Sequence, residues 1–437
     1  MMRPLKFLAL ALLAQSVQAQ DAAPLKTQVA ARVNSVYPQL ESIYKDLHAH
    51  PEIAFQELRT AGVLAADMRA IGFHVTEKIG KTGLVAIYKN GPGPTVMVRT
   101  ELDGLPMEEK TGLSYASKAR TLNDGRDTFV AHSCGHDIHM ASWLGAARTL
   151  VSLKSQWNGT LMFIAQPAEE TVSGAKAMLA DGLFTRFPKP DIAFALHSWP
   201  LAHGTVGYNS GPVSSNSDSI SIVFKGRGGH GSAPDKAIDP ILIAARFVVD
   251  VQAVISREKD PKEFGVVTIG VIQGGTVRNI IPDSVQLSGT IRSYSPAVRA
   301  KLLAGVRRVA NASAAMADAP APEVVLLPGG AAVINDEALA LKTEAVFKDA
   351  FGSANALRMP AMTGSEDFSE YLNQGVPGML FFTGVYDAKL LADAELAGGK
   401  PIAYNHSPYY APVPEPSIKT AVQAMSLAVL SALAPGK

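Results

Sequence analysis

The side chains best suited to chemistry gather in one stretch, His132-Ser133-Cys134-Gly135-His136-Asp137-Ile138-His139, which holds the only cysteine of the chain. A thiolate and an imidazole two residues apart on an extended backbone point the same way. Together they form half of a site for a borderline-soft metal. A lone cysteine is usually a buried structural residue, but the crowd of donors around Cys134 favours chemistry. The motif alone leaves two roles open, metal ligand and cysteine nucleophile.

The elements around this stretch indicate where it sits. The β-prone residues 128–131 precede it, and apolar residues at helical spacing follow it from Met140 to Val151. This order predicts a strand that leads into an amphipathic helix, which is the place in α/β proteins where sites are built.

Three further predicted strands end in polar side chains. The strand at 95–98 leads to Arg99, Glu101 and Asp103, the strand at 160–165 to Glu169 and Glu170, and the strand at 191–196 to His197. Parallel strands linked by helices bring such ends to one edge of a sheet. We therefore expect a Cys/His/Glu/His cluster there, and His406 is the best further ligand for a two-metal site. The adjacent Glu169 and Glu170 can divide the roles of general base and metal ligand.

Length and composition restrict the class of protein. A charged start, an apolar core at 7–14 and small residues up to Ala19 predict a secretory signal peptide over residues 1–19 and an exported, periplasmic or secreted protein. No later stretch is long and apolar enough for a membrane helix. Lys and Arg number 40 and Asp and Glu 39, without a basic run, so no nucleic-acid partner is expected. One cysteine excludes an internal disulfide.

The organisation of the chain changes near residue 211. Elements in the order β-α-β-β-α-β over about 219–327 predict a compact ferredoxin-like unit inserted into the first domain. The predicted fold is α/β, with a mostly parallel sheet and helices on both faces, and residues 20–212 and 329–437 form its catalytic domain. The insert spans 213–328, where the polar residues His230, Asn279 and Arg292 stand near strand ends. In the first domain we expect a helix at 27–47 split by Pro38 and a second helix at 55–70.

With these pieces placed, the chain resembles the aminoacylase/carboxypeptidase family of dinuclear metallohydrolases. The branch that it is most similar to contains the amidohydrolases that include hippurate hydrolase and the plant auxin–amino acid conjugate hydrolases. The motifs that carry the resemblance stand in family order over nearly the whole chain after residue 19. They are Leu47-His-Ala-His-Pro51-Glu52, Arg99-Thr-Glu-Leu-Asp103-Gly-Leu-Pro106, the stretch 132–139, Gln166-Pro-Ala-Glu169-Glu170, Gly228-Gly-His230-Gly-Ser-Ala-Pro234, Asn279-Ile-Ile-Pro282, Gly289-Thr-Ile-Arg292, Gly364-Ser-Glu-Asp-Phe368 and His406-Ser-Pro408.

The resemblance implies the role of each site residue. The implied metal ligands are Cys134, His136, Glu170, His197 and His406. They would hold two divalent ions, zinc or manganese first and cobalt or nickel as the other candidates. Glu169 is implied as general base and His230 as the histidine that stabilises the oxyanion, often across a dimer. Asn279 and Arg292 are implied as clamps for the substrate carboxylate.

The implied reaction is hydrolysis of the amide bond of a small N-acyl amino acid or a similar amide conjugate. The insert is implied to be a lid and dimerisation domain, so a homodimer is expected. The chain departs from the family pattern at Glu101, where aspartate is usual, and at Ser133, where alanine is usual.

Two other readings remain. A metal-free cysteine hydrolase would use Cys134 as nucleophile and His136 or His139 as base, and chelators would leave its activity unchanged. An exported, periplasmic solute-binding protein would bind its ligand without consuming it, and a change at Glu169 would matter little.

Overall fold

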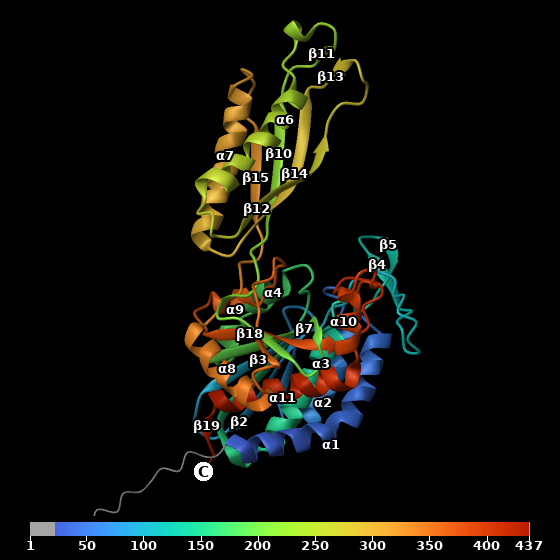
Figure 1. The fold of residues 1–437 in the computed structure, drawn as a ribbon, viewed down its shortest axis with the longest axis vertical. Coiled ribbons are helices and arrows are strands. Elements are labelled where there is room, and N and C mark those ends of the chain that lie inside the picture. The colour runs from blue at the N-terminus through green and yellow to red at the C-terminus, as the bar shows by residue number, and fades with distance from the viewer. Residues whose placement is uncertain (1–21, 437) are drawn as a thin grey trace, which may run out of the picture.

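The computed structural model describes residues 22–436. The predicted signal peptide at 1–19 therefore lies outside the described residues. Figure 1 shows a larger body of helices around a sheet and an elongated α+β unit that stands on this body. Within residues 22–436, no helix has both the length and the apolar character needed to cross a membrane.

The larger body is built on one sheet whose central strands are parallel. Its strands follow the order β1-β2-β6-β3-β7-β18-β8-β17, and β19 pairs with β6. They are β1 (His74–Ile79), β2 (Gly83–Asn90), β3 (Thr95–Glu101), β6 (Trp157–Gln166), β7 (Ile192–Ala202), β8 (Val206–Tyr208), β17 (Ala356–Arg358), β18 (Gly378–Tyr386) and β19 (Ala434–Pro435). Strands β6, β3, β7 and β18 run parallel to their neighbours in this series. The predicted mostly parallel sheet is thus confirmed.

Helices cover both faces of this sheet, as expected. One face packs against α1 (Ala22–Ala49), α2 (Leu58–Ala70), α3 (His136–Ser152), α8 (Glu337–Phe351) and α11 (Pro414–Ala432) around a large buried cluster. The other face packs against the shorter α4 (Gly174–Ala180), α5 (Leu183–Arg186) and α9 (Ser369–Leu372) around a second cluster. Because β6 and β7 are buried along most of their length, they read as continuous apolar runs in the sequence.

The inserted unit has its own sheet and core. Strands β10 (Asp218–Lys225), β12 (Gly265–Gln273), β14 (Ser284–Ser293) and β15 (Glu323–Pro328) form a sheet of order β12-β14-β10-β15. Helices α6 (Pro240–Asp250) and α7 (Pro296–Ala315) cover one face of it. This is the predicted β-α-β-β-α-β arrangement with antiparallel pairing. The short strands β11 (Gly229–His230) and β13 (Ile280–Ile281) pair at the end farthest from the larger body (Figure 1).

Two segments of the chain link the larger body to the inserted unit. Strand β9 (Gly211–Pro212), in the segment that leads into the insert, pairs with β16 (Ile334–Asn335), in the segment that leads back. One more helix, α10 (Ala388–Glu395), follows β18.

Two helix predictions were wrong in detail. Pro38 does not split the first helix, because α1 is continuous from Ala22 to Ala49. Pro38 lies on the exposed face of α1, so the carbonyl that loses its helical hydrogen bond faces water. Leu40 and Tyr44 lie on the opposite, fully buried face, and they pack α1 against the larger body. The second helix starts at Leu58 and not at Phe55, whose φ of 61° is incompatible with a right-handed helix.

The strand expected at 128–131 was also misplaced. Residues Arg126–Phe129 form β5, which pairs with β4 (Arg120–Asn123) in a separate hairpin. Asp124 and Gly125 both have positive φ, and they close this hairpin locally. The strand before Cys134 is therefore not part of the main sheet, and this strand does not place the cysteine at the edge of that sheet.

Candidate metal centre

The carboxyl ends of β3, β6 and β7 meet at one edge of the main sheet. Glu101 at the end of β3 lies opposite Gln166 at the end of β6. Arg99 of β3 lies opposite Ala195 of β7, two residues before His197. The prediction that these three strands deliver their polar ends to one place is therefore confirmed.

Cys134 comes to the same edge through the turn that starts α3. Gly135, the residue before this helix, has a φ of 90°, and a Cβ there would lie 2.4 Å from Ser198 Oγ. Glycine is therefore required for the turn to approach β7. Ser198 Oγ and Asn405 Nδ2 both donate to the Cys134 carbonyl, at 3.1 and 2.9 Å. These bonds fix the turn against the strand that carries His197.

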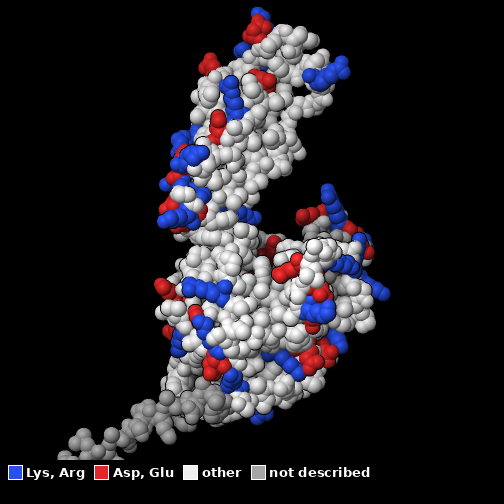
Figure 2. All heavy atoms as spheres, in the orientation of Figure 1, with Lys and Arg blue, Asp and Glu red and all other residues white. Residues whose placement is uncertain are grey.

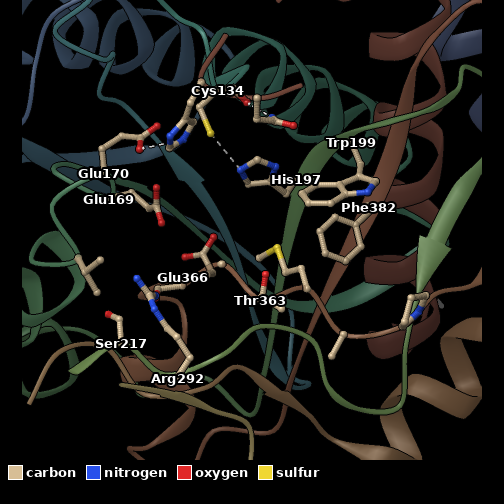
Figure 3. A pocket seen from close by; sticks show the side chains of 18 of the residues that line it. Cys134, Glu169, Glu170, His197, Trp199, Ser217, Arg292, Thr363, Glu366 and Phe382 are labelled. Atoms are coloured by element: carbon tan, nitrogen blue, oxygen red, sulfur yellow. Dashed lines mark hydrogen bonds and ion pairs between the residues drawn. The ribbon is translucent and has the colours of Figure 1, made fainter. Parts of the chain in front are cut away.

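The five predicted ligands are close together. Cys134 Sγ lies 3.4 Å from His197 Nε2, and His406 Nε2 lies 3.2 Å from Glu170 Oε2. His136 Nε2 lies 3.9 Å from Glu170 Oε1. Two groups of three donors share the thiol: Cys134 with His136 and His197, and Cys134 with Glu170 and His406. Figure 3 shows Cys134, His197 and Glu170 side by side at one end of the pocket.

The hydrogen bonding of these residues fits a bound metal. His136 Nδ1 lies 2.7 Å from the Asp103 carbonyl, and His197 Nδ1 lies 2.8 Å from the Ser198 carbonyl. Each ring therefore donates to the backbone from Nδ1 and presents the Nε2 lone pair to the cluster, as in metal-binding histidines. Within residues 22–436, His136 Nε2 and Glu170 Oε1 are buried atoms without a hydrogen-bond partner. Buried polar atoms are rarely left so, and a cation would satisfy both.

A neutral thiol would be a poor nucleophile in this cluster. Burial and then the negative charges of Glu170 and Glu169 raise the pKa of the Cys134 thiol well above its usual range. A nucleophilic cysteine needs the opposite, a nearby positive charge that favours thiolate. A divalent ion would supply that charge and turn Cys134 into a ligand.

Asp103 holds the two glutamates in place. Its carboxylate accepts hydrogen bonds from the main-chain amides of Glu169 and Glu170, both at 3.0 Å. The preceding Ala168 has a φ of 50°, which is uncommon for a residue with a side chain. The main-chain amide of Ala168 also donates to the buried carboxylate of Glu57, at 2.9 Å. Two buried acids therefore hold the turn after β6 in a specific conformation, which presents the carboxylates of Glu169 and Glu170 to different neighbours.

Glu169 lies next to the cluster of predicted ligands but makes fewer close contacts with their side chains than Glu170 does. Its Oε2 is 3.8 Å from His136 Nε2, and it also faces Glu366. Burial, then the charges of Glu366 and Glu170, raise the pKa of Glu169 well above its usual range. A buried carboxyl group with a raised pKa and a face to the pocket can take up and release a proton.

A buried arginine sits behind the site. Arg99 donates to Gln166 at 3.0 Å, to Glu366 at 2.7 Å and to Asp367 at 3.0 Å, and it also pairs with Glu101. These contacts connect β3 to the loop before α9. In the sequence analysis Glu366 and Asp367 appear only within a family motif, and no role was predicted for them.

One cavity of about 980 Å³ lies between the larger body and the insert. Its lining includes four of the predicted ligands together with Glu169 and Arg292. The remaining predicted ligand, His136, does not line the cavity, but its donor atom lies within 4.8 Å of those of Cys134 and His197. Its wall also carries apolar side chains that the sequence did not single out: Trp199, Phe382, Met359, Met362 and Phe264. The sequence could have indicated Trp199, because it follows His197 by two residues on one strand and so points to the same face of the sheet.

His230 and Asn279 do not line this cavity. His230 lies in β11, and Asn279 is in the loop just before β13, at the far end of the insert. Both are exposed. Within one chain the structure therefore places Arg292 in the same cavity as the predicted ligands and leaves His230 and Asn279 apart from them.

The chain is similar to several known proteins. The model of peptidase family M20/M25/M40 matches residues 97–431. The chain is 37% identical to a hippurate hydrolase of Campylobacter jejuni over 76% of this chain and 84% of the relative. It is 34% identical to an N-acetylcysteine deacetylase of Bacillus subtilis over 80% and 88%. A solved dinuclear metal-binding M20 peptidase of Bacillus subtilis has a TM-score of 0.75 and 28% identity, covering 92% of this chain and 99% of that one.

Proposed function

This chain belongs to peptidase family M20/M25/M40, and from that premise we propose that it hydrolyses the amide bond of N-acyl amino acids. It is a metal-dependent amidohydrolase, as its named relatives are hydrolases and deacetylases of such compounds. The observation that carries the proposal is the position of Cys134, whose sulfur belongs to two three-donor groups at once. A shared thiolate suits a pair of divalent ions.

The proposed mechanism assigns a task to each side chain. The residues that would hold two divalent ions are Cys134, His136, Glu170, His197 and His406. Such ions polarise an amide carbonyl and lower the pKa of a nearby water.

Glu169 is the general base in this proposal. It takes the proton of the attacking water and later returns it to the leaving amine. The raised pKa of Glu169 and its place in the cavity wall support this role. Glu170 carries a metal and Glu169 carries the proton, so the two adjacent acids do not compete.

The donor set also bears on the metal. Thiolate and imidazole ligands suit zinc, and carboxylates suit manganese, so these two are the first candidates, with cobalt and nickel next.

We propose that two copies of the chain form a homodimer through the insert at 213–328. Among residues 22–436, strand β12 pairs only with β14 and so forms an edge of its sheet, and its residues Val271 and Ile272 are 42% and 53% exposed. Exposed apolar edge strands favour pairing with another chain. In Figure 2 the charged side chains of the insert gather on the side of α7, whereas the opposite side is mostly free of charge. In the dimer, His230 and Asn279 of one copy would serve the other copy's site, with His230 stabilising the oxyanion.

We also propose that the protein is exported to the periplasm or the medium. The support is the signal-peptide pattern of residues 1–19 alone.

The test is hydrolysis of a panel of N-acyl amino acids by the purified protein, followed as amine release. Activity that disappears after chelation and returns with zinc or manganese is the expected result. Activity that chelation leaves unchanged would favour the cysteine hydrolase instead, and stable binding without turnover would favour a solute-binding protein.

A further inference from the structure

We propose that one wall of the cavity is a subsite for a bulky, aromatic-sized acyl group, so that the enzyme prefers aroyl amino acids to acetyl amino acids. We call the side chains of Trp199, Phe382, Met359 and Met362 the acyl wall. This inference rests on the proposed function and makes it more specific. Family membership does not decide the point, because one relative is named for hippurate, a benzoyl compound, and another for an acetyl compound.

The acyl wall is built next to a metal ligand. Trp199 follows His197 by two residues on β7, so both side chains leave the strand on the same face. Phe382 of β18 lies directly opposite His197 in the parallel pairing of the two strands. The rings of Trp199 and Phe382 pack with centroids 5.3 Å apart at 56°. The wall therefore has a fixed position relative to the place where the scissile carbonyl binds.

The two methionines complete the wall from the segment after β17. The main-chain amide of Met359 donates to the Tyr208 carbonyl at 2.8 Å, and that of Met362 donates to the Val213 carbonyl at 2.8 Å. Their backbone is anchored, while their flexible thioether chains can adapt to a ring placed between them. All four side chains of the acyl wall line the cavity.

The direction of the substrate follows from Arg292. This residue lies on β14 opposite Val266, on the face of the insert sheet that looks into the cavity, and it donates to Ser365. Figure 3 shows Cys134, Glu170 and His197 along the upper part of the pocket, Arg292 at the bottom and the Trp199–Phe382 pair at the right, beside His197. If Arg292 holds the substrate carboxylate, the amide lies at the metal ligands and the acyl substituent extends to the acyl wall.

An acetyl group would be too small for this subsite. Its methyl group would leave the aromatic pair and the methionines in contact with water, whereas a phenyl ring would cover them and displace that water. A well-formed apolar pocket discriminates by roughly 10- to 100-fold per missing small group. We therefore expect kcat/KM for N-benzoylglycine to exceed that for N-acetylglycine by at least about tenfold.

The experiment compares four substrates with the metal-loaded, full-length protein: N-acetylglycine, N-benzoylglycine, N-phenylacetylglycine and N-acetylphenylalanine. The variant Trp199→Ala should lower kcat/KM for the two aromatic acyl substrates by about tenfold more than it lowers kcat/KM for N-acetylglycine. Trp199→Phe should retain most of the preference. Leu58→Ala, which removes an apolar side chain that is 63% exposed on α2, is the matched control and should leave kcat/KM unchanged for all four substrates.

The possible results separate the claims. Equal or better hydrolysis of N-acetylglycine by the wild type would overturn the subsite, and so would an equal loss on all substrates in Trp199→Ala. A strong preference for N-acetylphenylalanine over N-benzoylglycine would place the ring on the amine side and overturn the direction. The wild-type comparison decides even if the variant fails to fold. If none of the four is hydrolysed, the proposed function itself fails.

Discussion

The carboxylate of Asp103 accepts a 3.0 Å hydrogen bond from the main-chain amide of Glu169. Its other oxygen accepts one from the amide of Glu170, also at 3.0 Å, and its carbonyl oxygen lies 2.7 Å from Nδ1 of His136. Asp103 is fully buried and does not line the cavity. One residue that does not line the cavity thus orients the proposed base and two of the proposed ligands.

We predict that Asp103→Asn weakens metal binding. The amide side chain can accept from only one of the two main-chain amides, and its NH₂ group would face the other. Loss of such an orienting contact typically costs 10- to 100-fold in metal affinity or activity. Isothermal titration calorimetry with the metal measures the change in the dissociation constant. Asp124→Asn, at an exposed hairpin position, is the control, and a dissociation constant that is the same in both variants would exclude this role for Asp103.

We predict that Glu169→Gln keeps both metals and loses about 10²- to 10⁴-fold in kcat, because glutamine cannot take up a proton. Glu395→Gln, an exposed change on α10, serves as control. Elemental analysis and amine release on the same samples give the two values. Turnover close to that of the wild type would remove Glu169 as the base, and loss of metal would make it a ligand.

A third prediction concerns stability. His48 is buried between two acids, with Nδ1 2.6 Å from Asp137 and Nε2 3.1 Å from Glu109. Burial alone would lower the pKa of His48, but the hydrogen bonds that its ring donates to these carboxylates outweigh burial and raise the pKa to about 10. The rings of Tyr44 and Tyr115 lie against it, and burial raises the pKa of both, so they stay neutral.

Because this pKa is raised above its value in the unfolded chain, the charged His48 stabilises the fold fully below about pH 6.5, and the effect disappears as pH rises through about 10. We expect His48→Gln to lower the free energy of unfolding by on the order of a few kcal/mol at pH 6 and by much less at pH 10. Urea unfolding at both pH values tests this. A difference that does not change with pH would contradict the account.

The dimer proposal makes a fourth prediction. His230→Ala should retain metal and lose activity, as should Glu169→Gln. When the two variants are mixed under conditions where subunits exchange, half of the dimers contain one copy of each and have one intact site. Activity should then return to roughly one quarter of the wild-type value. Two variants that stay inactive when exchange is demonstrated would mean that His230 acts within its own chain or not at all.

The sequence predicted most of the site because the relevant side chains directly follow apolar strands. Glu169, Glu170 and His197 were placed correctly for this reason, since the ends of parallel strands meet by topology alone. The strand before Cys134 was misplaced because the turn at Asp124 and Gly125 lets residues 120–129 pair locally. No pattern of apolar spacing distinguishes a local hairpin from a strand of the main sheet.

Other contacts could not be predicted because they join distant parts of the chain. Arg99 and Glu366 are 267 positions apart, and their ion pair depends on how the loop before α9 packs. The role of Asp103 depends on two main-chain amides, which the sequence does not distinguish from any others. The acyl wall required the pairing of β7 with β18, which places Phe382 beside His197.

The most direct test of the central claim is the metal content of the purified protein, measured by elemental analysis for the wild type and for Cys134→Ala. If Cys134 serves both metal positions, the wild type should hold two divalent ions per chain, and the variant should lose both rather than one. A wild type that holds no more than one ion, or a variant that keeps two, would contradict a centre built around a shared thiolate.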